Sequence, residues 1–429
     1  MKEIIKKIIV ESQQRNYSEA KSRSLEILFD SGMIVSLIGA RRCGKTYLLY
    51  NVINKLRLSG VDSENIFYIN FEDERLQLET AELDLILQAY MELYPEKQLS
   101  DCYFFFDEIQ NINGWEAFIR RVFDTISKKI FITGSNSKLL STEIATSLRG
   151  RTISYTVYPL QLREYLDFRN IQIEFYQSQK KAMLINATHD FMCNGGFPEV
   201  LNMESNMRVK VLQSYYNTMI YRDIVERYKI ADPLLLKYFI KKIISAVGKP
   251  LSINKIYNDL HSQGYKVSNN YLYTYEDYCK TIFLTIGISK FDFSEIKQAK
   301  SDKKTYCIDT GFISSLEFTL TENYGKLLEN MVLLEFLKLD FEAFYYKEKY
   351  ECDFVVRKAN ELRAIQVCYS TRDSETMERE IRGLVEACKY LNIKEGIIIT
   401  FDETQQTIIK NEIIIKVIPV YVYFLKETS

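Results

Sequence analysis

The segment from Gly39 to Thr46, which reads Gly-Ala-Arg-Arg-Cys-Gly-Lys-Thr, has the residue types and spacing of a phosphate-binding loop. Its two glycines let the backbone wrap so that several N–H groups converge on phosphate oxygens, and a helix that begins at Thr46 adds a favourable dipole. Lys45 would neutralise the β- and γ-phosphates, and Thr46 would be a ligand of Mg²⁺. The residues expected to contact ATP are Gly39, Ala40, Arg41, Arg42, Cys43, Gly44, Lys45, Thr46 and Tyr47.

Two adjacent carboxylates, Asp107 and Glu108, follow the apolar run Cys102–Phe106. Such a run predicts a buried strand, and the carboxyl edge of a strand is where α/β sheets bind ligands. Asp107 would hold the Mg²⁺ shell, and Glu108 would polarise an attacking water as the general base. The alternative is a pair of solvated acids at the end of a strand.

Small polar residues end a further apolar run, Lys129–Thr133. Thr133, Ser135 or Asn136 would orient the attacking water or contact the γ-phosphate, and the sequence does not choose among the three. The alternative is an ordinary N-cap between a strand and a helix.

Arg149 and Arg151 flank Gly150 shortly before the next apolar run. Either arginine would stabilise charge in the transition state, from its own subunit or from a neighbouring one. The second possibility implies a homo-oligomer. A salt-bridged pair of surface arginines is an equally good interpretation.

Five apolar runs alternate with amphipathic helical segments up to about residue 160. Continuous apolar strands separated by helices predict a parallel sheet with helices on both faces, so residues 1–160 are expected to form an α/β P-loop NTPase domain. The predicted strands are Met33–Ile38, Asn65–Phe71, Cys102–Phe106, Lys129–Thr133 and Thr152–Val157.

Three further regions follow this domain. Residues 161–231 are helical and aromatic, which predicts a helical lid. Residues 232–315 contain a helix capped by Ser252, a turn, a second helix and two strands (Thr281–Lys290 and Lys303–Asp309), which is the winged-helix pattern. Residues 316–429 form a second α/β unit with the predicted order helix (Gly325–Lys338), three strands (Ala343–Lys347, Cys352–Arg357, Leu362–Cys368), helix (Ser374–Tyr390) and strand (Gly396–Thr400), and another apolar strand closes the chain.

Composition narrows the function classes. The chain has 429 residues and a net charge of -1, which excludes a chain that binds nucleic acid through its overall charge. Its eight cysteines form no CxxC pair and it has only two histidines, which argues for reduced thiols in the cytoplasm and against a zinc site. The most apolar segment, Ile413–Leu425, is shorter than the ~20 residues of a membrane helix and predicts a buried strand, so no membrane contact is expected.

These motifs together resemble the AAA+ superfamily. The phosphate-binding loop, Asp107-Glu108, the segment Thr133–Asn136 and the arginines before Tyr158-Pro159-Leu160 carry the resemblance. More narrowly, the chain looks like prokaryotic ATPases with an AAA domain, a winged helix and a C-terminal domain of unknown function. The segments Tyr221–Arg227 and Lys304–Gly311 also match that group.

The C-terminal unit is similar to the PD-(D/E)xK, or restriction-endonuclease-like, core. That resemblance implies a metal-binding Glu329 on a helix, Asp353 on a strand and a Glu-x-Lys element at Gln366 and Cys368. Gln366 replaces the carboxylate and Cys368 replaces the lysine. Since a neutral amide binds Mg²⁺ poorly and a thiol supplies no ammonium, we expect no nuclease activity.

Two functions from different classes remain. The first is an ATPase that uses ATP and Mg²⁺ and whose nucleotide state moves the lid and the winged helix. The second is a nucleotide-gated adaptor with little turnover that binds DNA or another protein. In either, DNA would contact the predicted helix Val267–Cys279 and the loop around Lys300, Lys303 and Lys304, although Glu276 and Asp277 on the same helix favour a purely structural wing.

Overall fold

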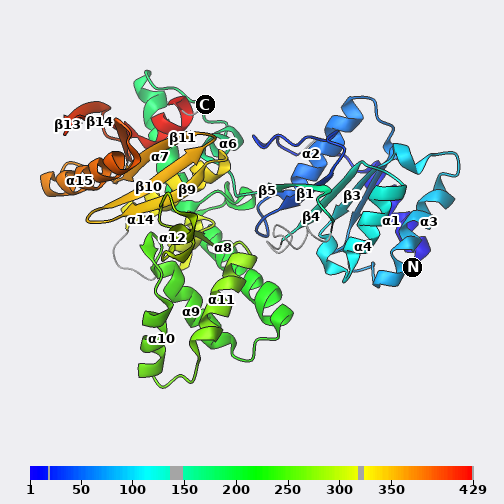
Figure 1. The fold of residues 1–429 in the computed structure, drawn as a ribbon. Coiled ribbons are helices and arrows are strands. Elements are labelled where there is room, and N and C mark those ends of the chain that lie inside the picture. Colours follow the sequence, from blue (N-terminus) through cyan, green and yellow to red (C-terminus); the bar gives the residue numbers. More distant parts are fainter. Residues whose placement is uncertain (18–19, 136–147, 317–322, 428–429) are drawn as a thin grey trace. The chain divides into compact units, whose positions relative to one another are not determined.

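The chain folds into two compact units, which Figure 1 shows in a computed structural model that describes residues 1–17, 20–135, 148–316 and 323–427. The first unit comprises Met1–Val157 with the short segment Thr281–Phe283. The second comprises Tyr158–Lys280 and Leu284–Ser429. Each unit has its own sheets and is described by itself.

The first unit is built on a five-stranded sheet in which all neighbouring strands are parallel. The predicted parallel sheet is therefore confirmed, and each strand coincides with a predicted run to within a residue at either end. The strand order is β2-β3-β4-β1-β5, with β1 at Ile34–Ile38, β2 at Ile66–Asn70, β3 at Tyr103–Asp107, β4 at Ile130–Gly134 and β5 at Thr152–Thr156. The helices are α1 (Lys2–Gln14), α2 (Lys45–Leu58), α3 (Asp84–Leu93) and α4 (Trp115–Thr125).

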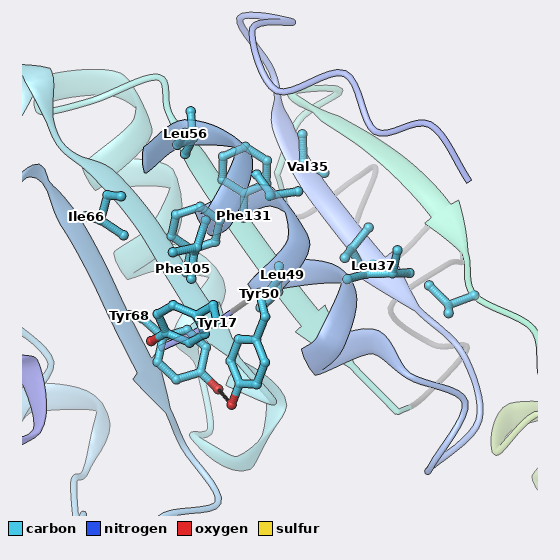
Figure 2. Close-up of a cluster of buried hydrophobic side chains, with 14 of the residues drawn as sticks. Tyr17, Val35, Leu37, Leu49, Tyr50, Leu56, Ile66, Tyr68, Phe105 and Phe131 are labelled. Carbon is cyan, nitrogen blue, oxygen red and sulfur yellow. Dashed lines mark hydrogen bonds between the residues drawn. The ribbon is translucent and has the colours of Figure 1, made fainter. Parts of the chain in front are cut away.

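A hydrophobic cluster fixes α2 against this sheet (Figure 2). Leu49 and Leu56 of α2 pack with strand residues, and the rings of Phe105 and Phe131 stack with their centroids 4.7 Å apart. Burial of one such side chain contributes roughly 1.5–3 kcal/mol. The cluster therefore holds the beginning of α2 at a fixed place relative to the strand ends.

The second unit begins with helices and contains a small antiparallel sheet of order β6-β8-β7. Ser252 caps the helix that follows β6, as predicted, by accepting a hydrogen bond from Lys255 N–H. β7 and β8 lie within the two strands predicted for the winged helix, and α12 lies between them in the chain. The elements are α6 (Leu162–Phe168), α7 (Ser178–Asn194), α8 (Ser205–Ile220), α9 (Pro233–Ser245), β6 (Lys249–Pro250), α10 (Ile253–Ser262), α11 (Asn269–Thr281), β7 (Thr285–Ile288), α12 (Glu295–Lys300), β8 (Lys304–Cys307) and α13 (Thr310–Leu316).

The rest of the second unit is a six-stranded mixed sheet of order β13-β14-β12-β11-β10-β9 with two long helices. The predicted order of helix, three strands, helix and strand is present. Two sequence predictions were wrong: β13 was missed, and the apolar run from Ile413 is a strand only as far as Pro419, after which the chain is helical. The elements are α14 (Tyr324–Lys338), β9 (Glu342–Lys347), β10 (Glu351–Lys358), β11 (Glu361–Val367), α15 (Ser374–Leu391), β12 (Glu395–Thr400), β13 (Gln406–Lys410), β14 (Ile413–Pro419) and α16 (Val420–Val422).

Candidate nucleotide site

Three strands of the first unit end side by side at one edge of the sheet. β1 pairs with β4 so that Ile38 lies opposite Gly134, and β3 pairs with β4 so that Phe106 lies opposite Ile132. Because the strands are parallel, the loop after β1, the acids at the end of β3 and the polar residues at the end of β4 meet at this edge.

Lys45 is the first residue of α2, and its side chain is buried. Its Nζ donates to the carbonyl oxygens of Gly39 and Ala40, at 3.1 Å each, and lies 3.2 Å from Glu108 Oε1. Burial acts to lower the pKa of Lys45, but Glu108 and its other neighbours outweigh burial and raise it. Gly44, the N-cap, has φ of +102°, a conformation that glycine adopts without strain.

The buried carboxylate of Asp107 accepts hydrogen bonds from three hydroxyl groups. Thr46 Oγ1 and Tyr68 OH both donate to Oδ2, at 2.8 Å each, and Thr133 Oγ1 donates to Oδ1. Burial and the charge of Glu108 raise the pKa of Asp107, while the three donors favour the ionised form. Thr46 and Asp107, the two predicted metal ligands, are therefore in direct contact.

Glu108 is buried and lies beside Lys45. Its backbone φ of +53° is unusual for a residue with a Cβ, and its N–H donates to Thr133 Oγ1 at 2.8 Å. Gln110 Nε2 donates to Oε2 of the carboxylate. Burial acts to raise the pKa of Glu108, but Lys45 and Gln110 outweigh it and hold the pKa below its ordinary value. The carboxylate is therefore ionised at neutral pH.

The polar residues at the end of β4 differ in their contacts. Thr133 is fully buried and bonds to both acids. Ser135 is also buried, with Gln110 Nε2 3.4 Å from its Oγ. Asn136 lies outside the described residues.

The prediction that Arg149 or Arg151 acts on the phosphates bound by its own subunit is wrong. Thr152 begins β5 opposite Ile34, the first residue of β1, so Arg149 and Arg151 lie before the starts of the strands. A strand rises about 3.3 Å per residue, which puts them roughly 16 Å along the sheet from the loop that follows Ile38. Neither arginine can act on the phosphate-binding loop of its own chain; Arg149 is exposed and Arg151 pairs with Asp124 at 2.9 Å.

The other residues of the loop have mixed environments. Arg41 pairs with Glu72 at 2.6 Å, Arg42 is exposed, and Tyr47 is 58% exposed. Cys43 is buried, and its carbonyl oxygen accepts from Arg23 at 3.0 Å. Their contacts with ATP remain predictions.

Sequence reasoning missed two residues that contact the acids, Tyr68 and Gln110. Tyr68 lies on β2 opposite Phe105 of β3, two residues before the pair Asn70–Asp107. The period of two along a strand places residues 68 and 70 on the same face, so a polar tip two residues before the end of the neighbouring strand was an available signal. Gln110 belongs to a short turn after Glu108, for which no sequence signal existed.

The donor set suits Mg²⁺, which takes few protein ligands and keeps several waters. A threonine hydroxyl in contact with one carboxylate, beside a buried lysine, is such a set. With the side chains as they lie within the described ranges, no group of three or more His, Cys, Asp or Glu is arranged to hold a metal ion.

The nuclease-like residues of the second unit lie around a cleft of about 970 Å³. Glu329, Asp353, Gln366 and Cys368 all line it. The burial of Cys368 raises the pKa of its thiol to about 11, which keeps it protonated. The predicted DNA contact of Lys304 is wrong because the side chain of Lys304 is 1% exposed and lies among carboxylates.

The geometry of the first unit defines a P-loop nucleotide-binding protein, and the comparisons with known proteins agree. Three family models match the chain: an AAA domain over residues 31–166, a domain of unknown function (DUF8612) over 185–330 and a domain of unknown function (DUF4143) over 324–423. An uncharacterized protein of Methanocaldococcus jannaschii is 36% identical, with 94% of this chain and 91% of that protein covered. An uncharacterized protein of Haemophilus influenzae is 30% identical over 79% of this chain and 83% of its own length.

The chain belongs to the family of these relatives, within the AAA+ superfamily of ATPases. Among solved structures, it is similar to the Aeropyrum pernix Orc1 protein in complex with DNA, with a TM-score of 0.31, 15% identity and coverage of 66% of this chain and 86% of that chain. Cdc6p from Pyrobaculum aerophilum gives a TM-score of 0.25 at 15% identity, with 71% and 90% covered. No helix in the described part of the chain is both long and apolar enough to span a membrane.

Proposed function

We propose that the protein hydrolyses ATP in a Mg²⁺-dependent reaction at the edge formed by β1, β3 and β4. The observation that carries the proposal is the contact of Lys45 with Glu108 at 3.2 Å, next to the contact of Thr46 with Asp107 at 2.8 Å. It joins a phosphate-binding cation, two metal ligands and a carboxylate base in one site.

Each residue has a role that its surroundings support. The ammonium of Lys45 is kept charged, so it can neutralise phosphate oxygens. Thr46 and Asp107 would hold Mg²⁺, which supplies electrophilic stabilisation of charge on the phosphates when bound. Glu108 is ionised, so it can accept a proton from a water, while Gln110 and Thr133 orient it.

The ion pair between Lys45 and Glu108 also supports an inactive state of the enzyme when no nucleotide is bound. In this arrangement the base is held by the cation that would contact phosphate, and two backbone carbonyls hold that cation further. A triphosphate would compete for Lys45 and release Glu108 towards water. Nucleotide binding would thereby free Glu108 to act as the general base. We propose that nucleotide binding also moves the helices at 161–231 and the winged helix.

The experiment is steady-state ATP hydrolysis with nucleotide binding measured in parallel by calorimetry. We expect Lys45→Ala to lose both binding and turnover. We expect Glu108→Gln to bind ATP and to lose turnover by about 10²–10⁴-fold, the usual contribution of a general base. Lys55→Ala, an exposed lysine on the same helix, is the matched control and should behave as wild type. Wild-type turnover in both site variants would rule out this site.

A second candidate, a nucleotide-gated DNA-binding adaptor, is favoured by the surface of α11. Asn270, Tyr271, Tyr273 and Thr274 are exposed there, and such side chains can bond to phosphates or contact bases. Fluorescence anisotropy with duplex DNA at several salt concentrations, with and without ATP, tests it. Salt-dependent binding that Tyr271→Ala weakens would support an adaptor role, and no binding at low salt would exclude it.

The cysteines support a reducing compartment, and we propose the cytoplasm. All eight are free, although several are buried deeply enough to be inert.

A further inference from the structure

Lys304 is a buried cation that reaches from one part of the second unit into another. It lies on β8 of the winged-helix sheet, and its side chain is 1% exposed. Its Nζ is 2.6 Å from Glu351 Oε1, 3.4 Å from Asp353 Oδ1 and 3.6 Å from Glu329 Oε1, and these three acids belong to the C-terminal sheet and α14. The ammonium of Lys304 on β8 therefore faces three carboxyl groups, two from β10 and one from α14.

The three acids around Lys304 also have other partners. Lys347, which is 52% exposed, pairs with the opposite oxygen of Glu351 at 2.9 Å. Tyr306 OH donates to Glu329 at 2.7 Å, and Val367 N–H donates to Asp353 Oδ2 at 3.0 Å. Burial acts to lower the pKa of Lys304, but the three acids outweigh it and raise the pKa, so the lysine is charged.

The contact of Lys304 Nζ with Glu351 at 2.6 Å has the length of a charge-assisted hydrogen bond, and those with Asp353 and Glu329 are longer ion-pair contacts. The ammonium occupies the space between the three carboxyl groups, where a divalent cation would need oxygen ligands. Gln366 lies where the nuclease resemblance implies a carboxylate, and both ends of its amide are hydrogen-bonded within the protein. Its Oε1 accepts from Asp353 N–H at 3.2 Å, and its Nε2 donates to Glu380.

Other hydrogen bonds join the same two parts of the second unit. The Asn330 amide pairs with both backbone groups of Cys307, at 2.8 and 3.0 Å. Lys326 Nζ donates to the carbonyl oxygen of Ile244 at 2.8 Å, and the backbone of Phe291 donates to that of Tyr345 at 2.7 Å. Polar contacts, among them those of Lys304, therefore join the winged-helix region to α14 and to the C-terminal sheet.

We propose that Glu329, Glu351 and Asp353 form a cation site whose resident occupant is the ammonium of Lys304, which excludes a divalent metal ion and locks the winged helix to the C-terminal domain. The acids that resemble a nuclease centre thus act as an anchor for the wing. A divalent cation and Lys304 compete for the same carboxylates. The proposal is independent of the proposed ATP hydrolysis, because it involves only the second unit.

The test uses the full chain and the substitution Lys304→Met, which keeps the aliphatic stem and removes the charge. Lys303→Met, at the exposed neighbouring lysine, is the matched control. Removal of one partner from a buried ion pair is strongly destabilising, so we expect the Tm of Lys304→Met to fall by roughly 5–10 °C and that of Lys303→Met to stay unchanged. Millimolar Mn²⁺, compared with sodium chloride at equal ionic strength, should restore part of the loss in Lys304→Met alone.

The double variant Lys304→Met/Asp353→Asn separates charge from packing. We expect it to be more stable than Lys304→Met and to lose the response to Mn²⁺, because one uncompensated carboxylate is gone. If Lys304→Met does not fold, the proposal requires that this double variant folds. It is overturned if the double variant also fails to fold, if Lys304→Met is as stable as the control, or if Mn²⁺ stabilises the wild type as much as it stabilises Lys304→Met.

Discussion

The hydroxyl of Tyr68 donates a 2.8 Å hydrogen bond to Oδ2 of Asp107, the same carboxylate oxygen that accepts from Thr46. Tyr68 comes from the neighbouring strand β2 and is buried, and burial, together with the charge of Asp107, raises its pKa well above the ordinary value. The tyrosine therefore stays protonated and remains a donor to Asp107 at any physiological pH. Tyr68 thus orients the carboxylate of Asp107, the proposed metal ligand.

The first prediction concerns this bond. Tyr68→Phe removes one donor from a buried carboxylate, and such a loss costs about 1–3 kcal/mol. We expect turnover to fall roughly 3–10-fold and the Mg²⁺ concentration for half-maximal rate to rise, as measured by titrating Mg²⁺ at saturating ATP. Tyr50→Phe is the control, because its hydroxyl is 3.4 Å from that of Tyr68 and does not bond to Asp107. Identical Mg²⁺ titrations for both variants would contradict the positioning role.

The second prediction separates the polar residues at the end of β4. Thr133 contacts both acids, whereas the contact of Ser135 within the described residues is a long one with Gln110. Thr133→Val keeps the shape and removes two hydrogen bonds, so we expect turnover to fall about 10–100-fold. Ser135→Ala should change it by less than about threefold. Rates measured at saturating ATP and Mg²⁺ decide this, and an equal loss in both variants would show that the hydrogen bonds of Thr133 are not special.

The third prediction follows from the position of Arg149, which lies at the edge of the sheet opposite the phosphate-binding loop. If it completes a site, that site belongs to another subunit. We then expect turnover per chain to rise with protein concentration, and Arg149→Ala to lose about 10³-fold while ATP binding is retained. Mixing Arg149→Ala with Lys45→Ala should restore part of the activity. Arg151 pairs with Asp124, so Arg151→Ala serves as the comparison. Turnover that is independent of concentration and unaffected by Arg149→Ala would exclude a shared site.

The fourth prediction concerns the stability of the second unit. The buried carboxylate of Asp309 accepts from the N–H groups of Gly196 and Gly311, at 2.7 and 2.8 Å, and burial raises its pKa from 3.8 to about 6. An acid with a raised pKa binds more protons in the folded state, so its contribution to the free energy of unfolding falls as pH rises from about 4 to about 6. The contribution lost is on the order of 2–3 kcal/mol.

Denaturant unfolding of wild type and Asp309→Asn between pH 4 and pH 8 measures this effect. We expect the stability of the wild type, relative to the variant, to be greatest near pH 4 and to decline through pH 6. A difference that stays constant or grows with pH would contradict the assigned shift. Gly195→Ala is a separate control for packing, because a Cβ at this glycine would lie 1.8 Å from the Asp309 carboxylate.

Local patterns in the sequence were sufficient for the phosphate-binding loop, for the five strands of the first sheet and for the acids that follow β3. Each depends on residues that are close in sequence: glycine spacing, an apolar run, or a polar residue at the end of a run. Parallel pairing then brings the strand ends together whatever the lengths of the connections. The two wrong predictions in the second unit have the same cause, since the sequence there lacks a clear local pattern. β13 is a short edge strand with exposed residues and no strong apolar pattern, and β14 ends at Pro419 although apolar residues continue to Leu425.

The sequence by itself therefore determined the class of protein and pointed to the residues that we propose bind phosphate and Mg²⁺. Tertiary structure decided which distant side chains serve those residues and which do not. It brought Tyr68 to Asp107, placed Arg149 at the far edge of the sheet, and buried Lys304 among acids that lie 25 to 49 positions away in the chain. Contacts of this kind are set by strand register and by the packing of one element on another, so the residues next to either partner in the sequence do not identify the other partner.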